Sequence, residues 1–296
     1  MHSFLSYSYC DHYNIYLDFI LARLAYRILR IAAVLRAWKT PRMRKGLYLL
    51  TLPLFITFQT FAQAPMMNRT LGPIENEVLE YNVYLKTGIF YFSLGEVVFT
   101  TTMESGLYKL NVSASTYPRW SRFYEFDSDF SSRLDSTNSY PLEFIRHSLE
   151  KGNSVFDSIR FDQKNLSAEE FVSNNDGELF TYDLKLGGRI HDMVSLFYRL
   201  RFIDYLSMSV GEQEKLKLLH NRHEYDMSVS YLDHESKKIK KGGKYDAYKI
   251  EINAIKGLHF EGNQVMSMWI TRDSKRIPVS FETPLKLGSL KIVLKE

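Results

Sequence analysis

Residues 188–208, GRIHDMVSLFYRLRFIDYLSM, form the clearest predicted helix in the chain and decide the predicted fold. Asp192 can begin this helix, because its carboxylate can accept a free backbone N–H at the positive helix end. Arg199, Arg201 and Asp204 fall on one side, which we expect to face solvent. We therefore expect one amphipathic helix over residues 190–207. Apolar residues recur on its other face at steps of three and four: Met193, Leu196, Phe197, Leu200, Ile203 and Leu206.

The rest of the chain is typical of β-strands. Its segments are rich in aromatic and β-branched residues, and several alternate apolar with polar side chains, as strands with one buried face do. Turn residues separate these segments at about ten-residue spacing, which is typical of an antiparallel sheet, sandwich or barrel. The predicted strands lie at 77–87, 89–102, 108–114, 119–130, 142–150, 155–161, 178–186, 215–219, 225–231, 248–254, 265–271, 276–281 and 289–294.

These elements predict a mainly β fold. We expect a strongly curved antiparallel sheet, or a partly open barrel, packed around the helix at 190–207. Residues 265–271 are apolar on both faces, so their strand should be central and covered. No long Pro, Gly or Ser linker interrupts residues 65–296, which favours a single β-rich domain.

The N-terminal region resembles a secretory signal. Arg42, Arg44 and Lys45 precede an apolar run at 47–58, and small residues follow at Ala62 and Ala64. This order predicts a signal peptide over 43–64, with cleavage near Ala62 or Ala64 and a periplasmic or otherwise extracytoplasmic location. Residues 1–42 are then an extension upstream of the native start, or alternatively a cytoplasmic segment.

Charge and cysteine content exclude several classes of protein. The formal net charge of +4 comes from the N-terminal region, because residues 65–296 hold 30 basic and 32 acidic residues. A nucleic-acid-binding domain usually carries a basic stripe, so we expect no nucleic-acid partner. The chain has one cysteine, Cys10, so the body has no disulfide, thiol nucleophile or thiolate metal site. We expect no cofactor.

Candidate catalytic residues are few, and the common hydrolase, nucleotide and zincin motifs are absent. His220, His223 and Glu224 resemble a metal cluster, but side chains three residues apart on a strand face opposite ways, so a solvated turn is favoured and no metal is expected. Asp127 and Asp129, with Glu125 nearby, could act as paired acids. Ordinary amphipathic alternation explains them more simply.

Two further clusters have a simple structural interpretation. His191, Asp192 and Ser195 contain the atoms of a catalytic triad, but helix capping by Asp192 accounts for the acid without an oxyanion hole. The lysine run at 237–244 could contact anionic lipid or polysaccharide. Protection of an exposed sheet edge is the favoured alternative. The 20 Phe and 20 Tyr could line an apolar pocket or form plain core.

Over about residues 75–296, the sequence resembles the bacterial family of domain of unknown function 3108. The matching segments are Tyr81-x-Val83 with Gly95-Glu96-Val97, Phe123-Tyr124 with Pro141, the helix at 191–201, and Met268-Trp269-Ile270-Thr271 with Arg276-Ile277-Pro278-Val279. The resemblance implies an exported β-rich protein without assigned activity, similar in shape to curved-sheet carriers of the bacterial envelope. It implies no catalytic residues. Its structural signature is carried by Asp192, Ser195, Tyr198, Arg201, Trp269, Arg276 and Pro278.

These observations predict an exported envelope protein that is not an enzyme and that binds an amphipathic ligand such as a lipid or glycolipid, with peripheral contact to the membrane. One alternative is an envelope glycan hydrolase using Asp127, Asp129 or Glu125, which requires two carboxyl groups about 5–10 Å apart across a cleft. Another is a scaffold in an envelope complex, which would expose a large apolar patch.

Overall fold

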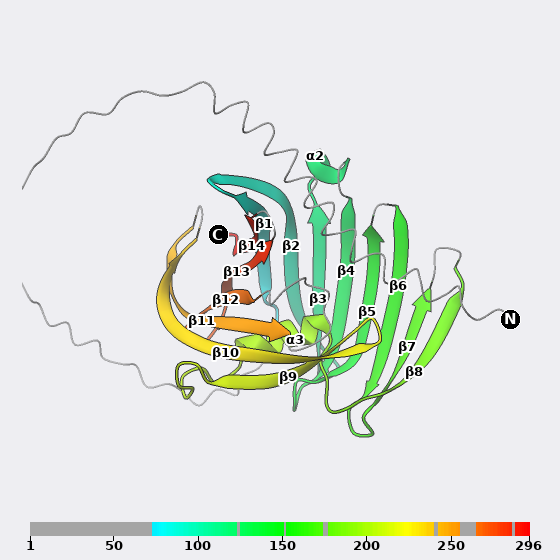
Figure 1. Cartoon of the computed structure of the whole chain (residues 1–296). Coiled ribbons are helices and arrows are strands. Elements are labelled where there is room, and N and C mark those ends of the chain that lie inside the picture. The colour runs from blue at the N-terminus through cyan, green and yellow to red at the C-terminus, as the bar shows by residue number, and fades with distance from the viewer. Residues whose placement is uncertain are drawn as a thin grey trace, which may run out of the picture.

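The fold is that of a computed structural model, which describes residues 73–122, 125–150, 152–173, 177–239, 242–254, 265–285 and 288–296. These residues form one antiparallel sheet of 14 strands (Figure 1). The elements are β1 Val78–Thr87, β2 Phe90–Glu104, β3 Leu107–Thr116, α2 Pro118–Ser121, β4 Phe126–Asp135, β5 Pro141–Glu150, β6 Asn153–Asp162, β7 Ser167–Ser173, β8 Leu179–Lys185, α3 Met193–Arg201, β9 Gln213–His220, β10 His223–Lys238, β11 Lys244–Ala254, β12 Met266–Thr271, β13 Pro278–Leu285 and β14 Gly288–Leu294.

The sheet consists of two meanders that meet in its middle. Strands β1 to β8 follow one another outward to one edge, and β14 back to β9 do the same toward the other edge. The meanders are joined by antiparallel pairing of β1 with β14, where Tyr81 lies opposite Leu294. Helix α3 occupies the connection between the two edge strands, β8 and β9. This arrangement confirms the predicted curved, open antiparallel sheet.

Irregular pairing accompanies the curvature of the sheet. The register shifts by one residue between Val83 and Tyr84 in β1, and between Tyr231 and Asp233 in β10. Such bulges bend a strand and increase its twist. At Gly95 in β2 a Cβ atom would lie 2.1 Å from the carbonyl oxygen of Ser115, so the two strands approach too closely there for any side chain. Figure 1 shows β10 and β11 curving around one side of the molecule.

The inner face of the sheet and helix α3 form the main core. Phe197 of the helix stacks on Phe99 of β2 and Phe281 of β13, with ring centroids 4.2 and 5.4 Å apart. Two strands from different meanders therefore close on one helix residue. Leu200 and Ile203 are buried in the same cluster. The predicted apolar face of the helix is thus the face that the sheet covers, with one exception.

That exception follows from the length of the helix. Helix α3 ends at Arg201, with Phe202 as its C-cap, so the prediction of a helix over 190–207 was too long. Beyond Phe202 the 3.6-residue period no longer applies, and Leu206 is 51% exposed. The prediction for Arg201 was also wrong: its side chain is fully buried instead of facing solvent.

Two strand predictions also need correction. Residues 119–130 do not form one strand, because Pro118 begins the short helix α2 and β4 starts only at Phe126. Strand β7 was missed, since SAEEFVS contains residues with low β propensity. By contrast, β12 is central as predicted: it lies between β11 and β13, and Trp269 on its outer face is buried as well.

None of the described helices is long and apolar enough to cross a membrane. The predicted signal peptide over 43–64 and the segment before it lie outside the described residues.

Candidate functional site

Helix α3 is fixed at its N-terminus by a buried carboxylate. The Asp192 side chain accepts hydrogen bonds from the backbone N–H groups of Val194 and Ser195, at 2.7 and 2.8 Å. It also accepts one from the hydroxyl of Ser132 in β4, at 2.6 Å. The Ser195 hydroxyl in turn accepts from the Asp192 N–H, which completes a capping box. Burial raises the pKa of Asp192 to about 6 although these hydrogen bonds oppose the shift. The geometry therefore shows that Asp192 caps the helix, and these contacts do not form a catalytic triad.

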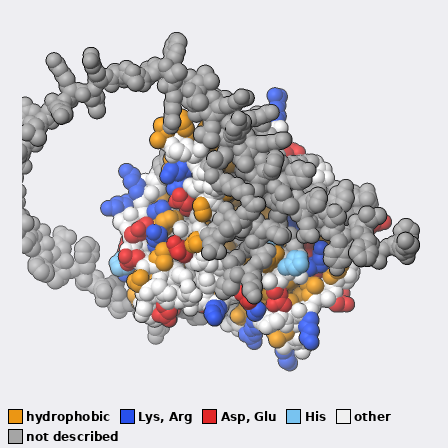
Figure 2. All heavy atoms as spheres, in the orientation of Figure 1, with side chains coloured by type: hydrophobic (Ala, Val, Ile, Leu, Met, Phe, Trp, Pro, Cys, Tyr) orange, Lys and Arg blue, Asp and Glu red, His pale blue; other side chains and the backbone are white. Residues whose placement is uncertain are grey.

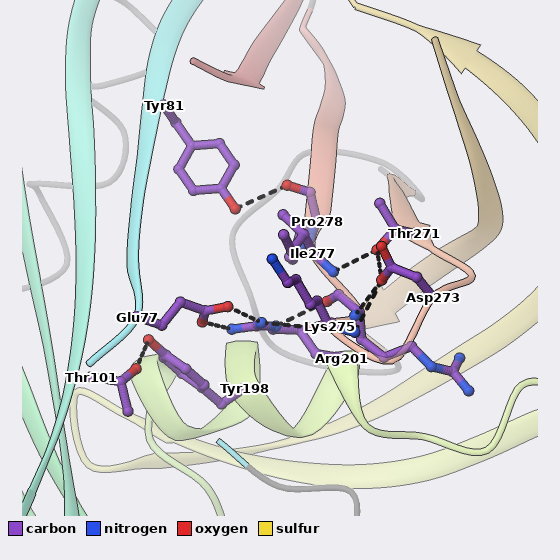
Figure 3. A network of polar contacts seen from close by, with 11 residues as sticks. Glu77, Tyr81, Thr101, Tyr198, Arg201, Thr271, Asp273, Lys275, Ile277 and Pro278 are labelled. Carbon is purple, nitrogen blue, oxygen red and sulfur yellow. Dashed lines mark hydrogen bonds and ion pairs between the residues drawn. The ribbon is translucent and has the colours of Figure 1, made fainter. Parts of the chain in front are cut away.

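The other end of α3 is held by Arg201 (Figure 3). Its guanidinium donates to both carboxylate oxygens of Glu77, at 2.6 and 2.8 Å, just before β1 begins. It also donates to the backbone carbonyls of Lys275 and Arg276 in the loop between β12 and β13, both at 3.0 Å. One side chain therefore ties the helix to both meanders. Tyr198 adds a 2.6 Å hydrogen bond to Thr101 in β2.

The remaining signature residues lie on β12, on β13 and in the loop between them. Tyr81 donates a 2.9 Å hydrogen bond to the carbonyl of Pro278. Arg276 has a positive φ of 50°, and its guanidinium lies 4.7 Å from the Tyr248 ring centroid. Trp269, in contrast, points to the outer face, where its indole N–H donates to Glu235. The signature set thus divides between the helix anchor and the opposite face of the sheet.

The outer face carries a groove near Trp269, which we call the lysine–tyrosine groove. It has a volume of about 420 Å³ and draws residues from β1, β2, β10, β13 and β14. Strands β2 and β10 are six positions apart in the sheet, so the sheet bends toward its outer face here. Tyrosine and aliphatic side chains combine with lysines in the lining: Tyr84, Tyr91, Lys237, Lys238, Ile239, Ser280, Lys291 and Val293.

Lys237 has an unusual environment for a cation. Its ammonium nitrogen lies 3.0 Å from the centroid of the Trp269 ring, a close cation–π contact. Burial, with the nearby charge of Lys291, lowers the pKa of Lys237 to about 8. Lys291 itself forms a 2.7 Å ion pair with Glu282. The groove therefore holds a partly desolvated ammonium group that a negative charge would stabilise.

The lysine run lies at a free sheet edge, as predicted, but only some of its side chains face that edge. Strand β9 pairs with β10 only from His223 to Ser230, so the half of β10 that carries Lys237 and Lys238 has no strand on that side in the described part of the chain. Lys238 is exposed there, as expected for edge protection, whereas Lys237 turns over Trp269. Lys240 and Lys241 lie outside the described residues.

The candidate metal cluster was assigned the wrong geometry. Asn221 and Arg222 both have positive φ values, 48° and 65°, and form a two-residue hairpin turn. His220 and His223 flank this turn as register partners, so they lie on the same face of the hairpin and not on opposite faces. Within the described residues, no group of three His, Cys, Asp or Glu side chains is arranged to hold a metal ion.

The candidate acids of a hydrolase lie on an exposed strand face. Asp127, Asp129 and Glu125 are all exposed, while Ser128 between the two aspartates is buried. These exposures match ordinary amphipathic alternation, which is the simpler of the two interpretations given by the sequence. Ser113 of β3 donates to Asp129 at 2.5 Å.

A buried acidic pair on the inner face was missed. Asp157 of β6 and Glu170 of β7 are 2% and 1% exposed, and Arg146 of β5 forms a 2.9 Å ion pair with Asp157. Burial, and the charge of Asp157, raise the pKa of Glu170 to about 7. The sequence could have indicated this pair only through strand alternation. Asp157, Glu170 and Arg146 lie two residues from Ile159, Ala168 and Phe144, and so point to the same inner face.

Charges of both signs are interspersed on the described surface shown in Figure 2, with apolar side chains between them. This agrees with the near-neutral balance of residues 65–296. The absence of a nucleic-acid partner remains a prediction.

These features define a class: an open, strongly curved antiparallel sheet wrapped around one doubly anchored helix, with a groove on its outer face. The chain belongs to the family DUF3108, described as a protein of unknown function, which matches residues 80–295. A comparison with curated proteins found no match.

Solved structures support the fold alone. The chain is similar to a beta-barrel-like protein of domain of unknown function DUF1849 from Brucella abortus, with 11% identity, 74% of this chain and 95% of that chain covered, and a TM-score of 0.52. A protein provisionally described as a lipoprotein from Parabacteroides distasonis shows 10% identity over 76% of this chain and 96% of its own. Its TM-score of 0.27 is too low to carry an argument.

Proposed function

We propose that this is an exported envelope protein, not an enzyme, that binds an amphipathic anion such as a fatty acid or an anionic lipid in the lysine–tyrosine groove. The observation that carries the proposal is Lys237, a half-buried ammonium whose pKa is lowered to about 8 beside an aromatic and aliphatic surface. A ligand that neutralises this charge and covers the apolar surface would relieve both unfavourable features.

The size and lining of the groove fit this ligand class. Its volume of about 420 Å³ falls within the range of small-molecule sites. Tyr84, Tyr91 and Val293 provide the apolar contact for a hydrocarbon chain. Lys237 and Lys238 provide positive charge for the headgroup. The same lysines would support peripheral contact with an anionic membrane surface.

Export is supported by the N-terminal sequence, which has the basic, apolar and small-residue order of a secretory signal over 43–64. The body of the chain contains no cysteine, so its fold requires no particular redox compartment. The aromatic core and the two helix anchors supply the stability that disulfides provide in many exported domains.

The two alternatives have weaker support. Asp127, Asp129 and Glu125 are exposed on β4, and no observation favours a hydrolase that uses them. A scaffold role would use the edge strand β8, where Leu179 is 69% and Phe180 42% exposed. An exposed edge lacks the combination of enclosed volume and partly desolvated charge that the groove has.

The test uses the fluorescence of Trp269, which lies under Lys237. In a Trp120→Phe background, Trp269 is the single tryptophan after residue 64. We expect dodecanoate to change this fluorescence saturably and to bind at least about tenfold more tightly than dodecanol, which lacks the negative charge. Native mass spectrometry of gently purified protein should show a retained adduct of lipid mass.

Lys237→Met keeps the apolar stem and removes the charge, so it should lose the preference for dodecanoate. Lys164→Met, at an exposed turn, is the matched control and should bind like the parent protein. Equal binding of dodecanoate and dodecanol, or an unchanged preference in Lys237→Met, would exclude the groove as an anion site.

A further inference from the structure

The hairpin between β1 and β2 ends in an exposed apolar turn. Ile89 in this turn is 80% exposed, more than any other large apolar side chain in the described part of the chain. Gly88 completes the turn with a positive φ of 56°, and a Cβ atom added there would meet nothing within 4 Å. In Figure 2, apolar side chains gather at the place where Figure 1 draws the end of this hairpin. The turn therefore projects with its apolar side chain uncovered.

Aromatic side chains continue from the turn along β2 toward α2. Phe90 and Phe92 stack with ring centroids 6.3 Å apart, and Phe92 meets Trp120 of α2 edge-on at 6.2 Å. The Trp120 indole N–H donates a 2.7 Å hydrogen bond to the carbonyl of Ser93, which fixes α2 against β2. Half-buried aromatic rings of this kind favour the interface between water and lipid. We call the following residues the aromatic tip: Ile89, Phe90, Tyr91, Phe92 and Trp120.

The charges beside the aromatic tip are all positive. Segments 81–95 and 117–122 contain Lys86, Arg119 and Arg122 and no Asp or Glu. The Lys86 ammonium lies 5.9 Å from the Tyr91 ring centroid, and the Arg119 guanidinium lies 5.3 Å from that of Tyr117. Arg119 and Arg122 are exposed. The surface is therefore apolar at its end and cationic at its margin, which complements an anionic lipid surface.

The backbone of this hairpin suits a lipid environment. Strands β1 and β2 pair as far as Thr87 and Phe90, so the turn consists of only two residues, Gly88 and Ile89. Backbone N–H and C=O groups that enter lipid without a partner are costly, because no water is present to bond them. In a hairpin that is paired up to its turn, this cost is limited to the turn itself.

The aromatic tip adjoins the lysine–tyrosine groove. Tyr91 belongs to both, because it lines the groove together with Tyr84, whose ring lies edge-on 6.4 Å away. Tyr91 follows Ile89 by two residues, which is about 7 Å along a strand. Apolar groups of peripheral proteins enter a bilayer by about 5–10 Å. When Ile89 enters to this depth, the groove therefore lies at the level of the lipid headgroups.

We propose that the aromatic tip docks the protein on an anionic lipid bilayer, with Ile89 inserted and Arg119 and Arg122 on the headgroups. Docking places the groove where it can take lipid from the bilayer or return it. This inference rests on the proposed function, because it names the surface from which the groove receives its ligand. A protein partner fits less well, since a projecting tip of a few side chains is smaller than the about 20–30 residues that a stable interface takes from each side.

The experiment places a fluorescent reporter in the turn. In a Cys10→Ser background, Ile89→Cys supplies the single cysteine of the chain, which is labelled with a polarity-sensitive nitrobenzoxadiazole dye. We expect vesicles of equal parts phosphatidylglycerol and phosphatidylcholine to shift its emission saturably to the blue, because the dye leaves water. Val210→Cys is the matched reporter: Val210 is 70% exposed in another turn, and a dye there should not respond.

A pair of single variants tests the apolar contribution by cosedimentation with the same vesicles. Ile89→Asp should weaken vesicle binding at least about tenfold, because it removes the inserted side chain and adds a negative charge. Val210→Asp makes the same change at the other exposed turn and should bind like the parent protein. Thermal unfolding should be unchanged in both variants, since both side chains are exposed.

A pair of double variants tests the electrostatic contribution. Arg119→Gln combined with Arg122→Gln should weaken binding to the anionic vesicles at least about tenfold. Lys164→Gln combined with Lys185→Gln removes the same charge at exposed positions outside the tip. This control should change vesicle binding by less than about twofold, because charges beyond the screening length contribute little.

Four results would each overturn the proposal. They are the absence of binding to the anionic vesicles, equal binding to vesicles of phosphatidylcholine alone, an Ile89→Cys label that stays in water while the protein sediments with the vesicles, and equal losses in the two double variants. Dodecanoate binding without vesicles is measured separately, and Ile89→Asp should bind dodecanoate as the parent does. Failure of docking therefore leaves the groove result intact, and failure of the groove leaves the docking result intact.

Discussion

Arg201 is fully buried and has four hydrogen bonds to three residues, two of them to Glu77. A buried guanidinium is stable only when its charge and its donors are matched, because the loss of hydration is otherwise not offset. Here the carboxylate supplies the charge and accepts two hydrogen bonds, and two backbone carbonyls accept two more. The arrangement lets one side chain make polar contacts from the helix to both meanders.

Removing one partner of this pair should be strongly destabilising. We expect Glu77→Gln to lower the free energy of unfolding by about 3–5 kcal/mol, because it leaves the guanidinium charge buried and uncompensated. Urea unfolding measures the change. Glu143→Gln, which breaks the more exposed pair with Arg133, should cost less than about 1 kcal/mol. Equal losses in the two variants would contradict the structural role of Arg201.

Glu170 should make stability depend on pH. Its pKa is raised from 4.5 to about 7 in the folded protein, so between these values the folded state binds more protons than the unfolded state. The stability that Glu170 lends to the fold through its extra bound proton is therefore fully present below pH 4.5. The free energy of unfolding then falls as the pH rises toward 7 and Glu170 ionises in the folded protein. We expect Glu170→Gln to match the parent near pH 4.5 and to be about 1–3 kcal/mol more stable above pH 7.

Urea unfolding at the two ends of this range checks the prediction. Glu169→Gln, on the neighbouring position of β7, should run parallel to the parent at both pH values. A constant difference between Glu170→Gln and the parent would show that Glu170 ionises in the folded protein as it does in the unfolded chain.

At the scale of elements, the period of the sequence predicted most strands and the core of the helix. Alternation in residues 108–114 and 225–231, for example, matches the inward positions of β3 and β10. The end of the helix could not be predicted in this way, because Ile203 and Leu206 fit the same period although only Ile203 is buried. What ends α3 is tertiary: the chain turns at Phe202, where Arg201 is fixed to the β12–β13 loop.

The candidate sites could be predicted from the sequence less well than the strands could. The role of Asp192 followed from a local rule, since an N-cap acts on residues next to it. The groove combines residues from distant strands, and no local pattern contains that information. Strand β7 was missed for a related reason: its buried Glu170 reads as a polar position unless Asp157 and Arg146 are known to lie beside it.

The end of the helix gives a matched pair of substitutions. Leu200 is 3% exposed in α3, whereas Leu206, predicted to lie on the same face, is 51% exposed. We expect Leu200→Ala to cost about 2–5 kcal/mol through lost burial and the cavity it leaves. Leu206→Ala should change stability by less than about 0.5 kcal/mol. Comparable losses measured by urea unfolding would mean that the helix continues through Leu206.

At the scale of the molecule, each face of the sheet carries a distinct feature. The inner face closes on α3, and the outer face bends around the lysine–tyrosine groove. Each is lined by residues from both meanders, so a change in the angle between the meanders would alter both. The proposed binding at the groove should for this reason depend on the shape of the whole sheet.

Groove binding should weaken at high pH. Lys237, with its pKa lowered to about 8, loses its charge as the pH rises through that value. We expect the affinity for dodecanoate to fall severalfold, by about 3–10 times, as the pH rises from about 7 to about 9.5. Fluorescence titrations of Trp269 measure the change. Lys237→Met should show weak, nearly constant binding over this range, and a parent protein that behaved the same way would exclude Lys237 as the headgroup contact.

The pairing of β1 with β14 has a consequence for how the protein is made. Residue 81 lies opposite residue 294, so the seam between the two meanders forms only when the final strand has emerged from the ribosome. Until then β1 and β13 each present an unsatisfied hydrogen-bonding edge, and the first eight strands can form only their own part of the 14-stranded sheet. A nascent polypeptide of this topology therefore cannot complete its sheet until the last strand of the described fold has been made.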